Sequence, residues 1–162
     1  MKRFVLGLGQ LVFGLSLLAA CGAPDVGVDR DLLIGTWAQQ GATQTDPSLV
    51  VENAVVTYAP DGWSTFDAVM TLTQPDGIPE RFTIRADVAW TLEETVLIRT
   101  LQDVTVTPDI STPQGDAVAG ALEDAYRNSP PGRLIVEDLT DETLSLLDAD
   151  TGTILSYARR SA

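Results

Sequence analysis

The residue types that carry most protein chemistry are scarce in this sequence. It contains no histidine and a single cysteine, Cys21, against 23 acidic residues. Without histidine, Ser-His-Asp and Cys-His catalysis and histidine-based metal sites are excluded. An enzyme would have to use paired carboxylates, as in glycoside hydrolysis, or an unusual serine site. The acidic pairs Glu93-Glu94 and Asp148 with Asp150 fall at predicted turns, where charges are usually solvated. We therefore expect no catalytic residue and no cofactor.

The segment Asp148-Ala149-Asp150-Thr151-Gly152 resembles the start of a calcium-binding loop. The glycine comes one residue too early, however, and no glutamate closes the loop, so the EF-hand pattern is not met. The segment instead predicts a hairpin turn between the seventh and eighth strands. We expect no metal site.

Cys21 lies at the end of an apolar N-terminal segment. Met1-Lys2-Arg3 is basic, and residues 4–18 are almost wholly apolar. This order predicts a secretory signal, because the apolar run is shorter than the ~20 residues that a membrane-spanning helix needs. Leu18-Ala19-Ala20-Cys21 resembles the bacterial lipobox, which implies cleavage before Cys21 and acyl chains such as palmitate on the mature cysteine. The alternative is an ordinary signal that is cut at Ala20.

The sequence therefore divides into a signal peptide over 1–20, a lipidated tether over 21–31 and one domain over 32–162. Proline, glycine and charge make the tether irregular. In Gram-negative lipoproteins an aspartate after the cysteine tends to mark inner-membrane retention, and here that residue is Gly22. We expect a cell-envelope protein that its lipid anchors to the outer membrane, facing the periplasm.

The charge of the predicted mature chain narrows its partners. Both lysine and arginine of the signal segment, Lys2 and Arg3, are removed, which leaves 8 arginines against 23 acids and a formal charge of −15. Such a surface repels phosphate backbones, so nucleic acid is a poor partner. It also repels anionic head groups, so that the lipid alone would hold the protein to the membrane.

The dominant period after the tether is two. Phe82, Ile84, Ala86, Val88 and Trp90 alternate with more polar residues, which is typical of a half-buried strand. Residues 65–72 show the same alternation, and turn sequences such as Pro60-Asp61-Gly62 and Pro75-Asp76-Gly77 separate the strands. The remaining predicted strands are 33–39, 49–59, 95–107, 132–138, 143–148 and 153–159. Eight strands at such short intervals predict a meander that closes into a barrel or folds into a sandwich.

One segment, 113–128, has helical periodicity instead. Thr112 and Pro113 provide a cap and a first-turn residue. Glycines make this helix weak by itself, so we expect it to pack on the wall of the sheet or across an open end. Its apolar stripe comprises Ala117, Val118, Ala121, Leu122, Ala125 and Tyr126.

The order of motifs resembles the bacterial lipocalin-like domains. The matching segments are Leu33-Ile34-Gly35-Thr36-Trp37, Tyr58-Ala59-Pro60-Asp61-Gly62-Trp63, Val88-Ala89-Trp90-Thr91-Leu92, Leu139-Thr140-Asp141-Glu142-Thr143-Leu144-Ser145-Leu146 and Ile154-Leu155-Ser156-Tyr157-Ala158-Arg159. The resemblance implies an all-β fold, an antiparallel up-and-down barrel of eight strands. The departure from the family pattern is the helical segment, which we place between strands five and six.

Three residues form a motif that the family uses structurally. Gly35 permits close approach of a neighbouring chain, and Trp37 can plug the floor of a small barrel. Arg159 or Arg160 of the last strand can stack on that indole. We expect this motif to support the barrel rather than to contact a ligand.

The barrel interior carries the functional prediction. An eight-stranded barrel is either filled by side chains or holds one small ligand. We expect a non-enzymatic, membrane-anchored protein that binds a small apolar ligand or lipid. The main alternative is an assembly accessory that docks an unknown protein partner through its acidic surface or helix, and a weaker one is a carboxylate-based hydrolase of envelope glycans. The predicted ligand-lining residues are Phe66, Met70, Phe82, Ile84, Val88 and Trp90.

Overall fold

The computed structural model describes residues 27–46, 48–74 and 77–161. The predicted signal segment, Cys21, most of the tether and two residues of one predicted turn, Pro75 and Asp76, lie outside the described residues. No helix of the described part is long and apolar enough to cross a membrane. The elements of this part are α1 (Arg30–Leu33), β1 (Gly35–Gln39), β2 (Thr43–Asp46), β3 (Leu49–Tyr58), β4 (Trp63–Thr73), β5 (Pro79–Glu93), β6 (Val96–Pro108), α2 (Pro113–Arg127), β7 (Gly132–Leu139), β8 (Thr143–Asp148) and β9 (Ile154–Arg159).

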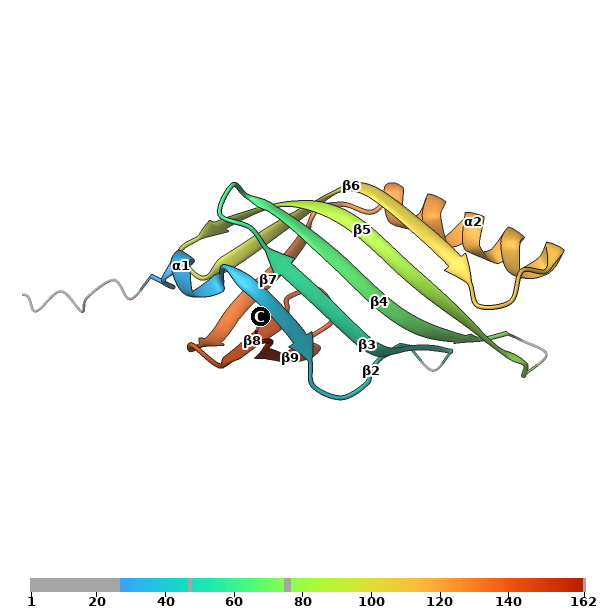
Figure 1. Ribbon diagram of the computed structural model, residues 1–162, viewed down its shortest axis with the longest axis horizontal. Coiled ribbons are helices and arrows are strands. Elements are labelled where there is room, and N and C mark those ends of the chain that lie inside the picture. The colour runs from blue at the N-terminus through green and yellow to red at the C-terminus, as the bar shows by residue number, and fades with distance from the viewer. Residues whose placement is uncertain (1–26, 47, 75–76, 162) are drawn as a thin grey trace, which may run out of the picture.

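The strands close into an antiparallel up-and-down barrel (Figure 1). Each strand from β3 to β9 pairs with the next along the chain, and β1 closes the sheet because it pairs with both β3 and β9. The short β2 pairs with β3 beyond the point where β1 ends. The closed wall thus contains eight strands, β1 and β3 to β9, which confirms the predicted fold class.

Side-chain alternation sets which face of each strand lies inside. In β5, Phe82, Ile84, Val88 and Trp90 are buried, whereas Arg85 and Asp87 between them are exposed. A strand with this period buries one face against a core and leaves the other in water. The alternation that predicts this strand from the sequence therefore also gives its orientation.

The helix α2 lies between β6 and β7, the fifth and sixth strands of the closed wall, as predicted. The Thr112 hydroxyl accepts a hydrogen bond of 2.9 Å from the Gly115 N–H, and Pro113 begins the helix. The predicted stripe is partly wrong, because Ala117, Ala121 and Ala125 are exposed. The face that packs on the sheet consists of Gly115, Val118, Ala119, Leu122 and Tyr126.

α2 takes the place of a neighbouring strand along part of β6. β6 pairs with β7 only between Val96 and Arg99, so its later residues have a free edge on that side. The Glu123 carboxylate accepts a 2.9 Å bond from the Val106 N–H, and Arg127 donates a 2.9 Å bond to the Val104 carbonyl. Covering an edge in this way blocks pairing with another chain.

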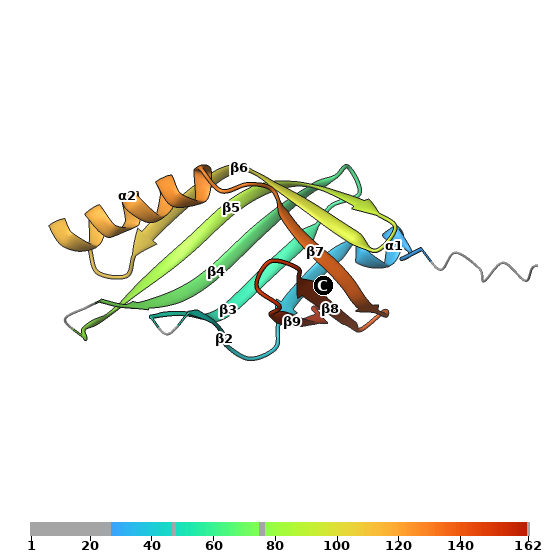
Figure 2. The same cartoon turned by 180° about the vertical axis from the view of Figure 1, so that it is seen from behind.

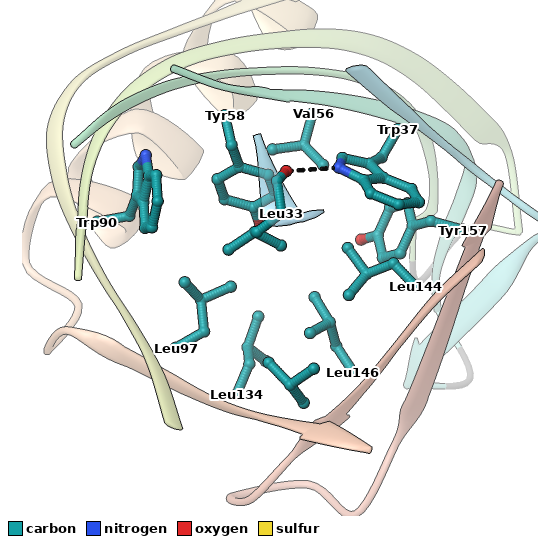
Figure 3. Packing of buried hydrophobic residues seen from close by; sticks show 11 residues of the cluster. Leu33, Trp37, Val56, Tyr58, Trp90, Leu97, Leu134, Leu144, Leu146 and Tyr157 are labelled. Atoms are coloured by element: carbon teal, nitrogen blue, oxygen red, sulfur yellow. Dashed lines mark hydrogen bonds between the residues drawn. The ribbon is translucent and has the colours of Figure 1, made fainter. Parts of the chain in front are cut away.

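The interior contains two hydrophobic clusters. The floor cluster lies within the closed barrel (Figure 3) and includes Leu33, Trp37, Tyr58, Trp90 and Leu97. The helix cluster lies where α2 packs on β4, β5 and β6, and it includes Met70, Phe82, Ile84, Val104 and Ala119. Figure 2 shows that α2 and the β7 to β9 strands cover different stretches of the long β3 to β6 sheet.

Candidate functional site

A cavity of about 550 Å³ opens between the two clusters. Its walls come from β4 to β6, β7 to β9, the last turn of α2 and the loop after it. Apolar side chains predominate, and the polar groups that line it are few. The apolar lining residues are Phe66, Ile84, Ala86, Val88, Leu101, Val104, Pro130, Leu134 and Leu155, together with the aromatic Tyr126.

Three of the six predicted ligand-lining residues line this cavity, namely Phe66, Ile84 and Val88. Met70 and Phe82 are fully buried in the helix cluster instead, and the Tyr126 hydroxyl lies 4.0 Å from the Met70 sulfur. Both residues fill space between the sheet and α2, so the position of the helix decides that they form core and not cavity wall.

The sixth predicted residue, Trp90, belongs to the floor of the barrel. Its ring meets Tyr58 edge-on, with 5.5 Å between centroids, and its indole N–H donates a 2.9 Å bond to the Trp63 carbonyl. The Arg30 guanidinium of α1 covers its face at 4.6 Å. Trp90 is therefore held on several sides by the protein itself, and it lies outside the cavity lining.

Gly35, Trp37 and Arg159 meet at the same end of the barrel. The Arg159 guanidinium lies 4.2 Å from the Trp37 ring centroid and donates to the carbonyls of Leu32 and Ile34, the latter at 2.8 Å. The Trp37 indole N–H donates a 2.8 Å bond to the Leu33 carbonyl (Figure 3). Any side chain at Gly35 would overlap the Arg159 guanidinium.

The sequence reasoning missed one charged residue in the cavity, Arg99. It pairs across the sheet with the buried Trp90, and opposite residues of two strands share a face. Arg99 and Phe66 line both the large cavity and a neighbouring hollow of about 160 Å³. The Arg99 Cζ atom lies 5.4 Å from the Phe66 ring centroid.

Two buried polar groups near this point have no partner among the described residues. They are the Arg99 Nε and the Tyr58 hydroxyl. Burial raises the pKa of Tyr157, which lines the smaller hollow, to about 12, and the proximity of Tyr58 acts in the same direction. Burial also raises the pKa of Tyr58. Both phenols are therefore uncharged at neutral pH.

The carboxylates of the described part of the chain are the remaining candidates for a catalytic pair or a metal site. No group of three or more acidic or cysteine side chains there is arranged to hold a metal ion. A shallow hollow of about 170 Å³ on the outer face of the sheet contains Asp67, Asp87 and Asp103, but Arg85 lies among them and pairs with Asp67 at 3.2 Å. The Asp148 to Gly152 segment forms the predicted hairpin turn, in which the Asp148 carboxylate accepts bonds from the Asp150 and Thr151 amides.

No protein-family model matches the sequence, and no curated protein matches it significantly. Among solved structures, the chain is similar to a lipocalin-like protein from Bacteroides uniformis, with 19% sequence identity and a TM-score of 0.43 over 80% of this chain and 99% of that one. The barrel assignment rests on the strand pairings of this chain itself.

Proposed function

We propose that this protein is a lipid-anchored, non-enzymatic protein of the cell envelope whose barrel binds a small apolar ligand. The observation that carries the proposal is the cavity of about 550 Å³ between the floor cluster and the helix cluster. Ligand pockets of ~300–1,000 Å³ that are mainly apolar, with a few placed polar groups, are typical of small-molecule sites.

The end of the barrel at which the first described residues lie supports the anchoring part of the proposal. α1 and the first described residues lie at the floor end, where the Val28 N–H donates to the Glu94 carbonyl of the β5–β6 turn (Figure 1). A lipid on Cys21 would hold this closed end toward the bilayer. We place the anchor in the outer membrane on its periplasmic face, on the sequence around Cys21 and Gly22.

The helix-docking alternative finds less support in the geometry. The larger apolar side chains of α2, Val118, Leu122 and Tyr126, pack against the sheet. The large hydrophobic residues that are exposed in the described part are Trp63, Ile78, Ile110 and Ile154, and none of them lies on α2. Partner-binding faces usually present contiguous apolar patches, so we do not propose this function.

Native mass spectrometry of the protein purified from the membranes of its own host tests the proposal. We expect a co-purifying small molecule, and bare polypeptide would contradict ligand binding. A second test uses the fluorescent apolar probe N-phenyl-1-naphthylamine. Ala86→Phe narrows the cavity and should abolish the fluorescence enhancement, whereas Ala89→Phe, which adds the same ring on the opposite face of β5, should retain it.

A further inference from the structure

Arg99 is a cation on the inner face of the barrel wall. It lies in β6 between Leu97 and Leu101, which also face inward, and opposite Trp90 of β5. A bulge at Gln102 then shifts the alternation, so that Val104 and Val106 face inward farther along the strand. Arg99 therefore belongs to the closed part of the wall, next to the cavity.

Arg99 differs from other arginines in what surrounds its charge. Arg81, Arg85 and Arg127 each pair with a carboxylate within 4 Å, and Arg159 donates to backbone carbonyls. Within the described part of the chain, Arg99 has no carboxylate within 4 Å, and its Nε is buried without an acceptor. The Arg99 guanidinium lies instead over the ring of Phe66.

An unpaired charge inside a protein is costly. Arg99 is only partly exposed, and its Nε is buried without an acceptor, so this donor has lost its water and gained no partner in the described part of the chain. Acids outnumber arginines almost threefold in the predicted mature chain, yet none of the described ones pairs with this cation. A hydrogen-bond acceptor for this cation is therefore better supplied by a bound ligand than by a side chain of the protein.

We propose that Arg99 binds the anionic head group of an amphipathic ligand, a single-chain carboxylate whose apolar chain lies along Phe66, Ile84 and Val88. This inference rests on the proposed ligand-binding function and specifies its substrate class. A guanidinium donates two parallel hydrogen bonds to a carboxylate, and no carboxylate of the described residues takes that place at Arg99. The neutral Tyr157 and Tyr58 add no competing charge.

Asp148 argues for a head group of low charge. It lines the same cavity as Arg99, and its carboxylate is oriented by the backbone amides of Asp150 and Thr151, at 2.9 and 3.2 Å. Its negative charge repels a bound anion, and it repels a doubly charged phosphate more strongly than a carboxylate. The pair therefore favours a monoanion over a phosphate ester.

The test compares three soluble probes of equal chain length: octanoate, 1-octanol and octylammonium. Binding is measured by isothermal titration calorimetry with the full chain in lipid nanodiscs, after subtraction of the heat from empty nanodiscs. We expect octanoate to bind at least about tenfold more tightly than octanol, because a hydrogen bond to a charged group contributes roughly 1.5–3 kcal/mol. Octylammonium should bind most weakly.

Three variants locate the effect. Arg99→Gln should abolish the preference, so that octanoate binds no more tightly than octanol. Arg133→Gln removes the same charge from an exposed position on the adjacent strand β7 and should leave the preference intact. Asp148→Asn should tighten octanoate binding severalfold, because a repulsive charge is removed.

The outcomes separate this inference from the proposed function. If octanol and octanoate bind equally, or if Arg99→Gln leaves the preference unchanged, the role of Arg99 is wrong and apolar binding survives. If none of the probes binds, both the inference and the proposed function are wrong. A preference for octylammonium would overturn the inference and assign the cavity to cations that Asp148 attracts.

Discussion

Replacing Gly35 by alanine tests the account of the barrel floor. Gly35 has a φ of 133°, a conformation that residues with a Cβ rarely adopt, and a Cβ there would overlap the Arg159 Nη1 atom. The backbone strain is worth about 1–3 kcal/mol. Displacing the guanidinium removes at least its 2.8 Å bond to the Ile34 carbonyl, a charged hydrogen bond worth about 1.5–3 kcal/mol. We expect Gly35→Ala to lower the free energy of unfolding by roughly 2.5–6 kcal/mol.

Gly152→Ala is the matched control. Gly152 also has a positive φ, 72°, but no atom lies within 4 Å of a Cβ at that position. It should therefore cost only the backbone term for a left-handed residue, about 1–2 kcal/mol. Both variants are compared with wild type by urea unfolding, followed by tryptophan fluorescence.

A double-mutant cycle with Arg159→Ala separates clash from strain. Once Arg159 is truncated, the overlap disappears, and Gly35→Ala should cost only its backbone term of about 1–3 kcal/mol. Contacting residues typically show such non-additivity. Equal costs for Gly35→Ala in both backgrounds, or a cost no larger than that of Gly152→Ala, would refute the close packing of Gly35 against Arg159.

Three further results are expected. Glu123→Ala leaves the Val106 N–H without its acceptor and should destabilise the fold by about 1–3 kcal/mol with faster amide exchange at Val106, whereas the exposed Glu137→Ala should change little. Burial raises the pKa of Tyr157 to about 12 from an unfolded value of ~10. Because the unfolded state loses this proton at lower pH than the native state, the free energy of unfolding should fall between pH 10 and 12. Urea titrations at each pH should show a flatter fall for Tyr157→Phe. Cys21→Ser should release the protein from the membrane fraction or stall its processing, and normal processing with full membrane retention would contradict lipidation.

The sequence was sufficient for the eight strands of the closed wall and for α2, but it did not predict the short α1 and β2. Buried side chains alternate along β5 because the strand faces water on one side and the core on the other, and this contrast is visible in the order of residues. α2 begins at Pro113 after Thr112 because that pair caps a helix. These are local effects, and each is encoded within a few residues.

The sequence of β6 does contain a pattern that places Arg99 inside the barrel. Leu97 and Leu101 share one parity along the strand, and Val104 and Val106 share the other. Such a switch indicates a bulge, since one extra residue moves every following side chain to the opposite face. With the bulge located, Arg99 falls on the same face as the two leucines, which places a charge inside the barrel.

Residues distant in the sequence decide that Met70 and Phe82 form core and do not line the cavity. Both alternate correctly for an inward face, and whether an inward residue lines a cavity or fills a core depends on what packs over it. Val118, Leu122 and Tyr126 of α2 cover these two residues. The periodicity of 113–128 predicts a helix but does not specify which stretch of the sheet it covers.

The same helix explains why the barrel has a cavity. Neighbouring strands lie about 4.8 Å apart, whereas a helix with its side chains is about 10–12 Å across. Beyond Arg99 the neighbour of β6 changes from β7 to α2, and the difference in width between a strand and a helix is accompanied by open space at this junction. The cavity is lined at that junction by Tyr126, Ser129 and Gly132. The helix α2, which takes the place of a neighbouring strand there, is therefore the feature that creates the candidate binding site, and it places an unpaired arginine at its edge.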